Sequence, residues 1–306
     1  MAEFSVHTLG CGSAKPTLRH QPSCTVVDHH DTLYMIDCGE GAQRAFQQQR
    51  LKFSRLRHIF LTHLHGDHVL GLPGLISTLA LGSTGGKLTI HTFAEGEKIL
   101  RQIFDFFAKD LSYELDFNII KPEDKVILDT HSLTVRTVKL SHRVPAVGFI
   151  FEEKPKPRHI RRDMIDYHQV PVSQIRSIKD GADFTKPDGT VIPNMMLTCD
   201  PTPSLSYGHI SDTAYMPSLA EKIGAVDLLF HETTYLDSHE REAKERFHST
   251  AKQAASVARE AGAKWLLTGH YSSRYKDDNA FKTEAGAVFP NVILNKEGLV
   301  TDLTKL

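Results

Sequence analysis

Three histidines and one aspartate lie within six consecutive residues, in the run His63-Leu-His65-Gly-Asp67-His68. Imidazole nitrogens and carboxylate oxygens are the ligands that hold zinc and similar divalent metals in proteins. Alternate side chains point the same way in an extended or turning backbone, so His63 and His65 can share one ion. Gly66 allows the chain to turn, after which Asp67 and His68 can face a second ion. The run therefore predicts a dinuclear metal site.

Further ligands are expected where a polar residue abruptly ends an apolar strand. In α/β folds, ligands lie beyond the carboxyl ends of the strands, so such loops should gather at one edge of a sheet. Together they would supply two more imidazoles and a carboxylate placed to bridge two ions. Four segments have this form: Leu133–Leu140 ends in Ser141-His142, Leu205–Ile210 in Ser211-Asp212, Val226–Phe230 in His231-Glu232, and Trp265–Thr268 in Gly269-His270.

A metal pair with a nearby proton donor has the parts needed to hydrolyse a phosphodiester. Metal binding lowers the pKa of water from about 15.7 towards 7, and two ions offset the charge that builds on the phosphoryl oxygens. Asp67 can ligate a metal and also orient or deprotonate the water. His248, with Glu232 to favour its charged imidazole, is a candidate donor of a proton to the leaving oxygen, although by its position alone it is more simply a surface residue before a helix cap. His248 also precedes a predicted helix whose free N–H groups favour a phosphate.

The elements that position these residues alternate between short apolar strands and amphipathic helices, which indicates an α/β architecture. Ser249 or Thr250 is expected to cap the last helix and Gly262 to end it. Strands are expected at Glu3–Leu9, Thr25–Val27, Leu33–Ile36 and Leu56–Thr62, the second and third as a hairpin. Helices are expected at Ala42–Arg50, Gly74–Leu81, Gly96–Ala108 and Thr250–Ala261.

One segment, from about Glu152 to Pro193, departs from this alternation. It has few large apolar residues, several prolines and, at its start, five cations without an acid. Charged segments are commonly solvated loops, yet a loop of this length is uncommon without a function. We expect one domain over residues 1–306 with an inserted flexible arm at 152–193. The cations of this arm, which are candidates for binding phosphate groups of a substrate, are Lys154, Lys156, Arg158, Arg161 and Arg162.

The composition bounds where this chemistry takes place. The chain has 306 residues, of which 40% are hydrophobic and 24% charged, as in globular proteins with a sizeable core. A formal net charge of −1 gives no global basic field, so a local patch would have to hold any nucleic acid. The four cysteines form no C-x-x-C pair, the N-terminus lacks the features of a signal peptide, and no apolar run approaches the roughly 20 residues of a membrane span. A cytoplasmic protein without membrane association is expected.

In these motifs the chain resembles the metallo-β-lactamase superfamily and, within it, the ribonuclease Z family of tRNA 3′-processing endonucleases. The His63–His68 run identifies the superfamily. The His231-Glu232 pair, His248 before a capped helix and the arm after residue 150 narrow the resemblance to ribonuclease Z. It covers nearly the whole chain in order, also through Leu9-Gly-Cys-Gly-Ser, Ile36-Asp37-Cys-Gly-Glu40-Gly, Ser141-His142-Arg143, Ser211-Asp212-Thr213, Phe247-His248-Ser249-Thr250 and Leu267-Thr-Gly-His270.

This resemblance implies an αββα sandwich and two Zn²⁺ ions per subunit, although the same ligand types also hold Mn²⁺ or Fe²⁺. It also implies a homodimer in which the arm of one subunit grips tRNA for the active site of the other. No organic cofactor is expected. By motif position, His63, His65 and His142 would hold the first ion, Asp67, His68 and His270 the second, and Asp212 would bridge the two.

The expected function is removal of the 3′ trailer from precursor tRNA, which leaves a 3′-hydroxyl on the tRNA and a 5′-phosphate on the trailer. Metal-activated water would attack phosphorus, with Asp67 as base and His248, paired with Glu232, as acid. Two alternatives remain. One is a small-molecule phosphodiesterase or thioesterase, because this fold and metal pair support several chemistries. The other is an inactive RNA-binding homologue, which would need a broken ligand set.

Two loops depart from the family's usual pattern. Where family members usually carry Pro-x-x-x-Arg-Asn, this chain has Pro16-Thr-Leu-Arg19-His20, so His20 stands in place of Asn and Arg19 remains a candidate for binding substrate. That loop is associated with reading the tRNA 3′ end. The arm has Gln169-Val-Pro171-Val where the bacterial form commonly has a glycine-proline step.

Two further residues have less specific expectations. Asp37, at a strand end, is expected to support a ligand by hydrogen bonding rather than bind metal directly. Arg274, soon after His270, is equally compatible with a phosphate contact and with an ordinary surface role.

Overall fold

The computed structural model describes residues 4–82, 86–108 and 111–306, and it divides into two compact units. The larger unit is built from the described residues up to Asp129, together with Val135–Phe151 and Leu205–Leu306. The smaller unit consists of Thr130–Thr134 and Glu152–Ser204. The expected arm, 152–193, therefore falls inside the smaller unit, which continues to Ser204. No helix in the described part of the chain has the length and apolar character that a membrane span requires.

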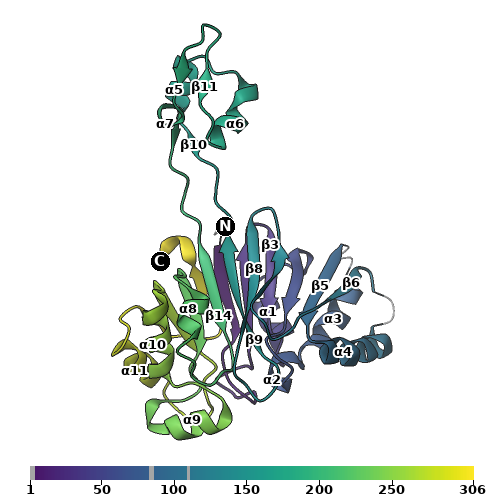
Figure 1. Ribbon diagram of the computed structural model, residues 1–306. Helices are drawn as coiled ribbons and strands as arrows, with labels where there is room; N and C mark the ends of the chain where they lie inside the picture. The colour runs from purple at the N-terminus through teal and green to yellow at the C-terminus, as the bar shows by residue number, and fades with distance from the viewer. Residues whose placement is uncertain (1–3, 83–85, 109–110) are drawn as a thin grey trace. The chain divides into compact units, whose positions relative to one another are not determined.

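The first sheet of the larger unit has seven strands in the order β18-β1-β2-β3-β4-β5-β6 (Figure 1). β1, β2 and β3 pair antiparallel, and the expected hairpin is confirmed by β2 and β3, with Asp28 opposite Leu33. β3 to β6 run parallel, so the chain leaves β4 at the same edge as its neighbours. The strands are β1 Phe4–Gly10, β2 Cys24–His29, β3 Thr32–Ile36, β4 Leu56–Phe60, β5 Lys87–Thr92, β6 Glu114–Ile119 and β18 Val300–Asp302.

The second sheet also has seven strands, in the order β17-β16-β15-β14-β9-β8-β7. β14, β15, β16 and β17 run parallel. Because parallel strands end at the same edge, the carboxyl ends of β14, β15 and β16 lie together, with Glu232 as the last residue of β15 and Asp212 and His270 just after β14 and β16. The strands are β7 Lys125–Asp129, β8 Leu133–Lys139, β9 Val147–Glu153, β14 Ser206–Ile210, β15 Leu228–Glu232, β16 Trp265–Gly269 and β17 Val292–Ile293.

The two sheets pack against each other through aromatic side chains. The ring of Phe60 on β4 lies 5.2 Å from that of Phe149 and 5.5 Å from that of Phe151, both on β9, measured between centroids. Such edge and tilted contacts add to the free energy of burying each ring. The packing leaves one face of each sheet to be covered by helices.

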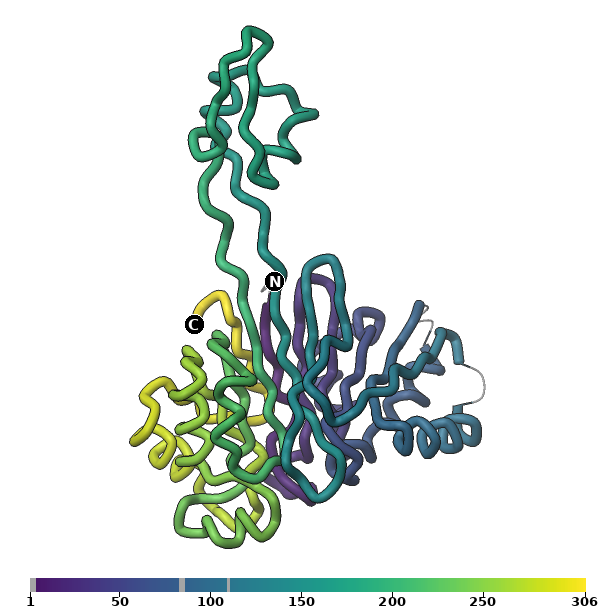
Figure 2. The backbone as a smooth tube through the Cα atoms, in the orientation of Figure 1, coloured from purple at the N-terminus to yellow at the C-terminus, as the bar shows by residue number. Residues whose placement is uncertain are grey.

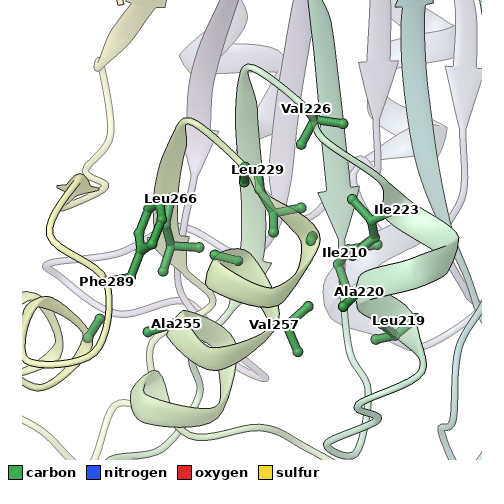
Figure 3. Packing of buried hydrophobic residues seen from close by; sticks show 14 of the residues in the cluster. Ile210, Leu219, Ala220, Ile223, Val226, Leu229, Ala255, Val257, Leu266 and Phe289 are labelled. Atoms are coloured by element: carbon green, nitrogen blue, oxygen red, sulfur yellow. The ribbon is translucent and has the colours of Figure 1, made fainter.

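Helices cover the two remaining faces, which confirms the expected αββα sandwich. On the first sheet, α1 Ala42–Gln48, α3 Leu72–Leu81 and α4 Ala94–Phe107 bury Phe46, Leu75 and Leu100 in its core cluster. On the second sheet, α8 Leu219–Ile223, α10 Ala251–Ala261 and α11 Asn279–Gly286 complete the other cluster. Figure 3 shows Ala255 on the side of α10 toward Leu266 and Phe289, and Val257 on the side toward Leu219 and Ala220 of α8.

The start and end of α10 follow the predicted signals. The Thr250 hydroxyl accepts a hydrogen bond from the Gln253 N–H, and the Gln253 side chain accepts one from the Thr250 N–H, which is a capping box. Gly262 ends the helix in the left-handed conformation, at φ 73°. The helix therefore begins at Ala251, three residues after His248, at the edge that carries the ligands.

The smaller unit has an apolar core that the sequence reading did not foresee. Its chain enters and leaves through segments that run side by side (Figure 2), where β10 His159–Ile160 pairs with β13 Thr198–Cys199. The buried Asn194 side chain donates to the carbonyls of Ile178 and Ala182 and accepts from the Thr198 hydroxyl. Its short helices are α5 Arg162–Tyr167, α6 Ile175–Lys179 and α7 Asn194–Leu197. The core residues are Ile165, Val170, Ile178, Phe184, Ile192 and Leu197.

Candidate metal centre and active site

The His63–His68 run follows β4 and turns into the short helix α2, Gly66–Val69. His65 keeps an extended backbone just before this helix, at φ −72° and ψ 151°. The turn at Gly66 thus places His63 and His65 on an extended segment and Asp67 and His68 on a helix, as the sequence predicts. His63 and His68 are fully buried.

Four donor atoms gather around a first candidate ion position. His65 Nδ1 lies 3.0 Å from His63 Nε2 and 3.2 Å from His142 Nε2. Asp212 Oδ2 lies 3.7 Å from His63 Nε2 and 3.9 Å from His142 Nε2. Ligands about 2.0–2.2 Å from one zinc ion stand about 3.3 Å apart at the corners of a tetrahedron. The spacing of these four atoms therefore fits a single ion.

A second set surrounds the other oxygen of the same aspartate. Asp212 Oδ1 lies 3.2 Å from His270 Nε2 and 3.6 Å from His68 Nε2. Asp67 Oδ2 lies 3.7 Å from His270 Nε2 and 3.5 Å from His68 Nε2. Asp212 thus turns one oxygen to each set, which is the geometry of a bridging carboxylate.

The buried nitrogens of the second set show that these residues fit a metal. His68 Nε2 and His270 Nε2 are both buried, and neither has a hydrogen-bond partner among the described residues. A buried polar atom without a partner is costly, and coordination of a cation would satisfy it. The donor set, with five imidazoles and two carboxylates, suits a divalent metal.

The far nitrogens of the ligand rings are held by hydrogen bonds that fix their tautomers. Asp37 accepts from His68 Nδ1 at 2.7 Å and from the Thr62 N–H and hydroxyl at 2.8 Å each. Since the Thr62 hydroxyl donates to Asp37, it accepts from His63 Nδ1 at 3.1 Å. His142 Nδ1 donates to the Phe247 carbonyl at 3.0 Å. Each bond leaves the Nε2 lone pair of the ring free for a metal.

Glu232 is fully buried and organises the proton-donor side of the site. One of its oxygens accepts from His248 Nδ1 at 3.0 Å and from the Ser249 N–H at 3.0 Å. The other accepts from the Thr234 hydroxyl at 2.6 Å, and this hydroxyl in turn accepts from His270 Nδ1 at 2.9 Å. The proposed acid and a ligand of the second ion are therefore joined through one carboxylate.

The charges of the site support these roles. Burial acts to lower the pKa of His248, but the charge and hydrogen bond of Glu232 raise it to about 9. Burial likewise acts to raise the pKa of Asp212, yet the imidazoles of His270, His68 and His63 hold it well below its usual range. Glu232 thus favours the protonated form of His248, and the neighbouring imidazoles favour the ionised form of Asp212.

The site opens into a pocket of about 520 Å³. Besides ligands, Tyr235 and His248, its lining includes four cationic side chains and three serines. The backbone N–H of Ala14, in the loop after β1, donates to Asp67 Oδ2 at 2.8 Å. The four cationic residues are Lys15, Arg143, Arg246 and Arg274, and the three serines are Ser13, Ser272 and Ser273.

Two groups of predicted substrate-binding residues have intramolecular partners. The Arg19 guanidinium donates to the carbonyls of Tyr275 and Lys276 and lies 3.4 Å from Asp278. Four of the five arm cations have a carboxylate of the smaller unit as partner. These pairs are Lys156–Glu153, Arg158–Asp200, Arg161–Asp163 and Arg162–Asp166, at 2.9 to 3.5 Å. Their binding of substrate stays a prediction, as it does for Lys154.

Sequence reasoning missed the residues that hold the ligands from behind. Thr62 lies two residues after the end of β4, and Thr234 lies two residues after the end of β15, so their positions near strand ends were the available signal. His231, in contrast, is buried with its Nδ1 bonded to the Glu232 carbonyl, and it belongs to neither ligand set. The hydrogen-bonding role expected for Asp37 corresponds to its contact with His68.

Two seven-stranded sheets, flanked by helices and joined at one edge by a histidine–aspartate centre, define a metallo-β-lactamase fold with a candidate divalent metal site. A model of the metallo-beta-lactamase superfamily matches residues 18–144, and a model of the beta-lactamase superfamily domain matches residues 169–271. The crystal structure of human tRNase Z, short form, superposes with a TM-score of 0.71 at 23% identity, over 98% of this chain and 99% of that one. That likeness shows the fold.

Sequence relatives identify the family within this class. A ribonuclease Z of Phocaeicola vulgatus is 49% identical over 300 residues, which cover 98% of this chain and 97% of its own length. A ribonuclease Z of Parabacteroides distasonis is also 49% identical, over 98% of this chain and 99% of its own. This chain belongs to the ribonuclease Z family of endoribonucleases.

Proposed function

We propose that this chain removes the 3′ trailer from precursor tRNA, with two Zn²⁺ ions bound per subunit. The observation that carries the proposal is the complete double set of ligands around Asp212, in a chain that matches ribonucleases Z over almost its whole length. The complete set also speaks against an inactive homologue. A homodimer, as the family resemblance implies, and the cytoplasmic location expected from the sequence features belong to the same proposal.

His63, His65, His142 and Asp212 would hold the first ion, and Asp67, His68, His270 and Asp212 the second. When bound, two such ions lower the pKa of a water molecule and offset the charge on the phosphoryl group. Asp67 lies at the mouth of the pocket with one oxygen fixed by the Ala14 N–H. It is placed to orient the attacking water and to accept its proton.

His248 is the proposed general acid. Its Nδ1 is occupied by Glu232, so its Nε2 is the nitrogen that can give a proton to the departing 3′-oxygen. The negative charge of Glu232 stabilises the protonated ring before the reaction and fixes its orientation. Transfer of that proton leaves a 3′-hydroxyl on the tRNA, and the phosphate stays on the trailer.

The test is incubation of zinc-loaded protein with a 5′-labelled precursor tRNA that carries a 3′ trailer, beside an Asp67→Ala variant. A trailer-free tRNA that ends in CCA serves as second substrate. We expect a cut near the discriminator nucleotide, absent in the variant. The result with the CCA-ended tRNA will show how the Arg19-His20 loop treats mature ends.

An intact precursor would contradict the proposal. If bis(p-nitrophenyl) phosphate or a thioester were then hydrolysed, the chain would be a small-molecule hydrolase on the same fold. If neither substrate reacted and metal analysis found no bound ion, the inactive RNA-binding alternative would be favoured.

A further inference from the structure

The pocket above the ligand sets carries an excess of positive charge that hydrolysis of one phosphodiester does not explain. Its four cations are Lys15, Arg143, Arg246 and Arg274. Among the described residues, no carboxylate pairs with the first three of these, and Arg274 has only Glu242, at 3.9 Å. This contrasts with the smaller unit, where four of the five arm cations are paired with acids. Three cations without a carboxylate partner in the described part of the chain, Lys15, Arg143 and Arg246, therefore line the same pocket as the ligand sets.

Two of the four cations are tied through their sequence neighbours to different ligand sets. Lys15 follows Ala14, whose N–H is fixed to Asp67 of the second set at 2.8 Å. Arg143 follows His142, which belongs to the first set. Lys15 and Arg143 therefore line one pocket, and each is next in sequence to a residue that belongs to, or is bonded to, a different ligand set.

Each of these positions is held by the fold. The loop of Lys15 is attached to the segment after β16, since the Ser13 N–H donates to the Tyr271 carbonyl at 3.1 Å. The Arg143 guanidinium donates to the Glu245 carbonyl at 3.2 Å, at the end of α9 Glu240–Arg246. An arginine held by a carbonyl keeps its full charge and further donors for a phosphate.

We propose that Lys15 and Arg143 bind the phosphates that flank the scissile phosphate, one on each side. This rests on the proposed ribonuclease function and names the substrate class of the same site: an internal bond of an RNA chain with charged phosphates on both sides. A small diester has no flanking phosphates and gains nothing from either cation. The pair thereby favours endonucleolytic cleavage over hydrolysis of small diesters.

The test combines Lys15→Gln and Arg143→Gln with precursor tRNAs in which one flanking phosphate is a neutral methylphosphonate. Arg241→Gln is the matched control. Arg241 is exposed on α9, the helix whose Glu245 carbonyl Arg143 contacts, and its side chain pairs with the Glu245 carboxylate without lining the pocket. Single-turnover kcat/KM is measured for every combination, and also with bis(p-nitrophenyl) phosphate.

We expect each Gln variant to lower kcat/KM for unmodified precursor at least five-fold, with a much smaller loss on the small diester. The slope of log KM against log salt should change by about 0.7 for each lost contact with a single strand. A methylphosphonate at one flank should lower kcat/KM of the wild type more than that of Arg143→Gln, which has already lost the contact with that phosphate. A methylphosphonate at the other flank should likewise lower kcat/KM of the wild type more than that of Lys15→Gln. Arg241→Gln should behave as wild type in every combination.

If the substitution and the methylphosphonate each lowered kcat/KM by the same factor whether or not the other was present, in every combination, the inference would be overturned. Coupling of both cations to the same flank would overturn it as well. Failure of the wild type to cut any precursor would instead overturn the proposed function, and this inference with it. Arg143→Lys, which keeps the charge, should recover part of the rate if the charge rather than the bond to Glu245 is responsible.

Discussion

The contact between His248 and Glu232 allows the acid role to be separated from simple binding. We predict that His248→Ala slows single-turnover cleavage of precursor tRNA by about 10²- to 10⁴-fold, because the 3′-oxygen would leave without a proton. Hydrolysis of bis(p-nitrophenyl) phosphate should suffer much less, since p-nitrophenolate needs no proton to leave. Metal content, measured in parallel, should be unchanged. Equal losses on both substrates would assign His248 to a different role.

Asp37 offers a test of the residues behind the metal. Its carboxylate accepts from His68 and Thr62 and is fully buried. We predict that Asp37→Ala weakens binding of the second ion by about 10- to 100-fold, as loss of such a partner does elsewhere. Competition with a chelator of known affinity measures this. Asp37→Asn, which tolerates the left-handed backbone at φ 57°, should lose less, and wild-type affinity in the alanine variant would refute the role.

At this scale the ligand residues could be predicted because their types and spacing carry the information. What supports them could not be read in the same way. Thr62 is an ordinary strand-end residue in the sequence, and its hydroxyl matters only because the fold sets it between Asp37 and His63. The left-handed backbone of Asp37 and His270, at φ 57° and 61°, has no sequence signal for residues other than glycine.

Among the elements, α10 is the one whose sequence signals were complete. Its capping box joins Thr250 and Gln253, directly after His248. We predict that Thr250→Ala lowers the free energy of unfolding by about 1 kcal/mol, because an N–H at the helix start loses its acceptor. Thr250→Ser keeps the hydroxyl and is the control. Urea denaturation of both variants measures the difference, and equal stability of the two would show that the cap contributes nothing.

The smaller unit shows where pattern reading failed. Its apolar residues, such as Ile165, Ile178 and Ile192, are spread thinly between charges and prolines, so no periodicity marks them. They form a core in which burial of apolar surface is accompanied by hydrogen bonds from the buried Asn194 side chain to the carbonyls of Ile178 and Ala182. A single asparagine gives no such signal in one sequence.

The same unit carries a prediction about substrate binding. Replacing Arg158, Arg161 and Arg162 together by Ala should raise KM for precursor tRNA several-fold, because phosphate contacts would be lost, with far less effect on a small diester. Steady-state kinetics with both substrates checks this. Arg158 also donates to the Thr198 hydroxyl at 2.7 Å, so circular dichroism must first show that the unit is folded. Similar losses on both substrates in a folded variant would remove these residues from RNA binding.

Across the larger unit, His20 connects distant parts of the chain. Its Nε2 lies 2.9 Å from Asp278 and its Nδ1 lies 3.1 Å from Glu297. The hydrogen bond with Glu297 raises the pKa of His20; burial acts against this, and Asp278 adds to it. Because its pKa is raised in the folded state, protonated His20 adds to the free energy of unfolding. This contribution is complete below the unfolded pKa of about 6.5 and is lost as the pH rises through the folded pKa.

We therefore predict that His20→Asn costs more stability at about pH 6 than at about pH 9. Urea denaturation of wild type and variant, both with saturating zinc, measures the cost at each pH. Taking the difference between the two proteins cancels the pH dependence of metal binding itself. A cost that does not fall on going to the higher pH would show that the histidine is not charged in the folded protein.

Each candidate ion would take its ligands equally from the two sheets. His63 and His65 follow the first sheet, whereas His142 and Asp212 follow the second, and the other set divides in the same way. Bound ions would thus cross-link the two sheets, because the sheets could not separate without releasing both ions. Saturation at 100 times the dissociation constant adds about 2.7 kcal/mol for each independent ion. Metal supply would then set how long the folded protein survives cellular proteases, as well as whether it is active.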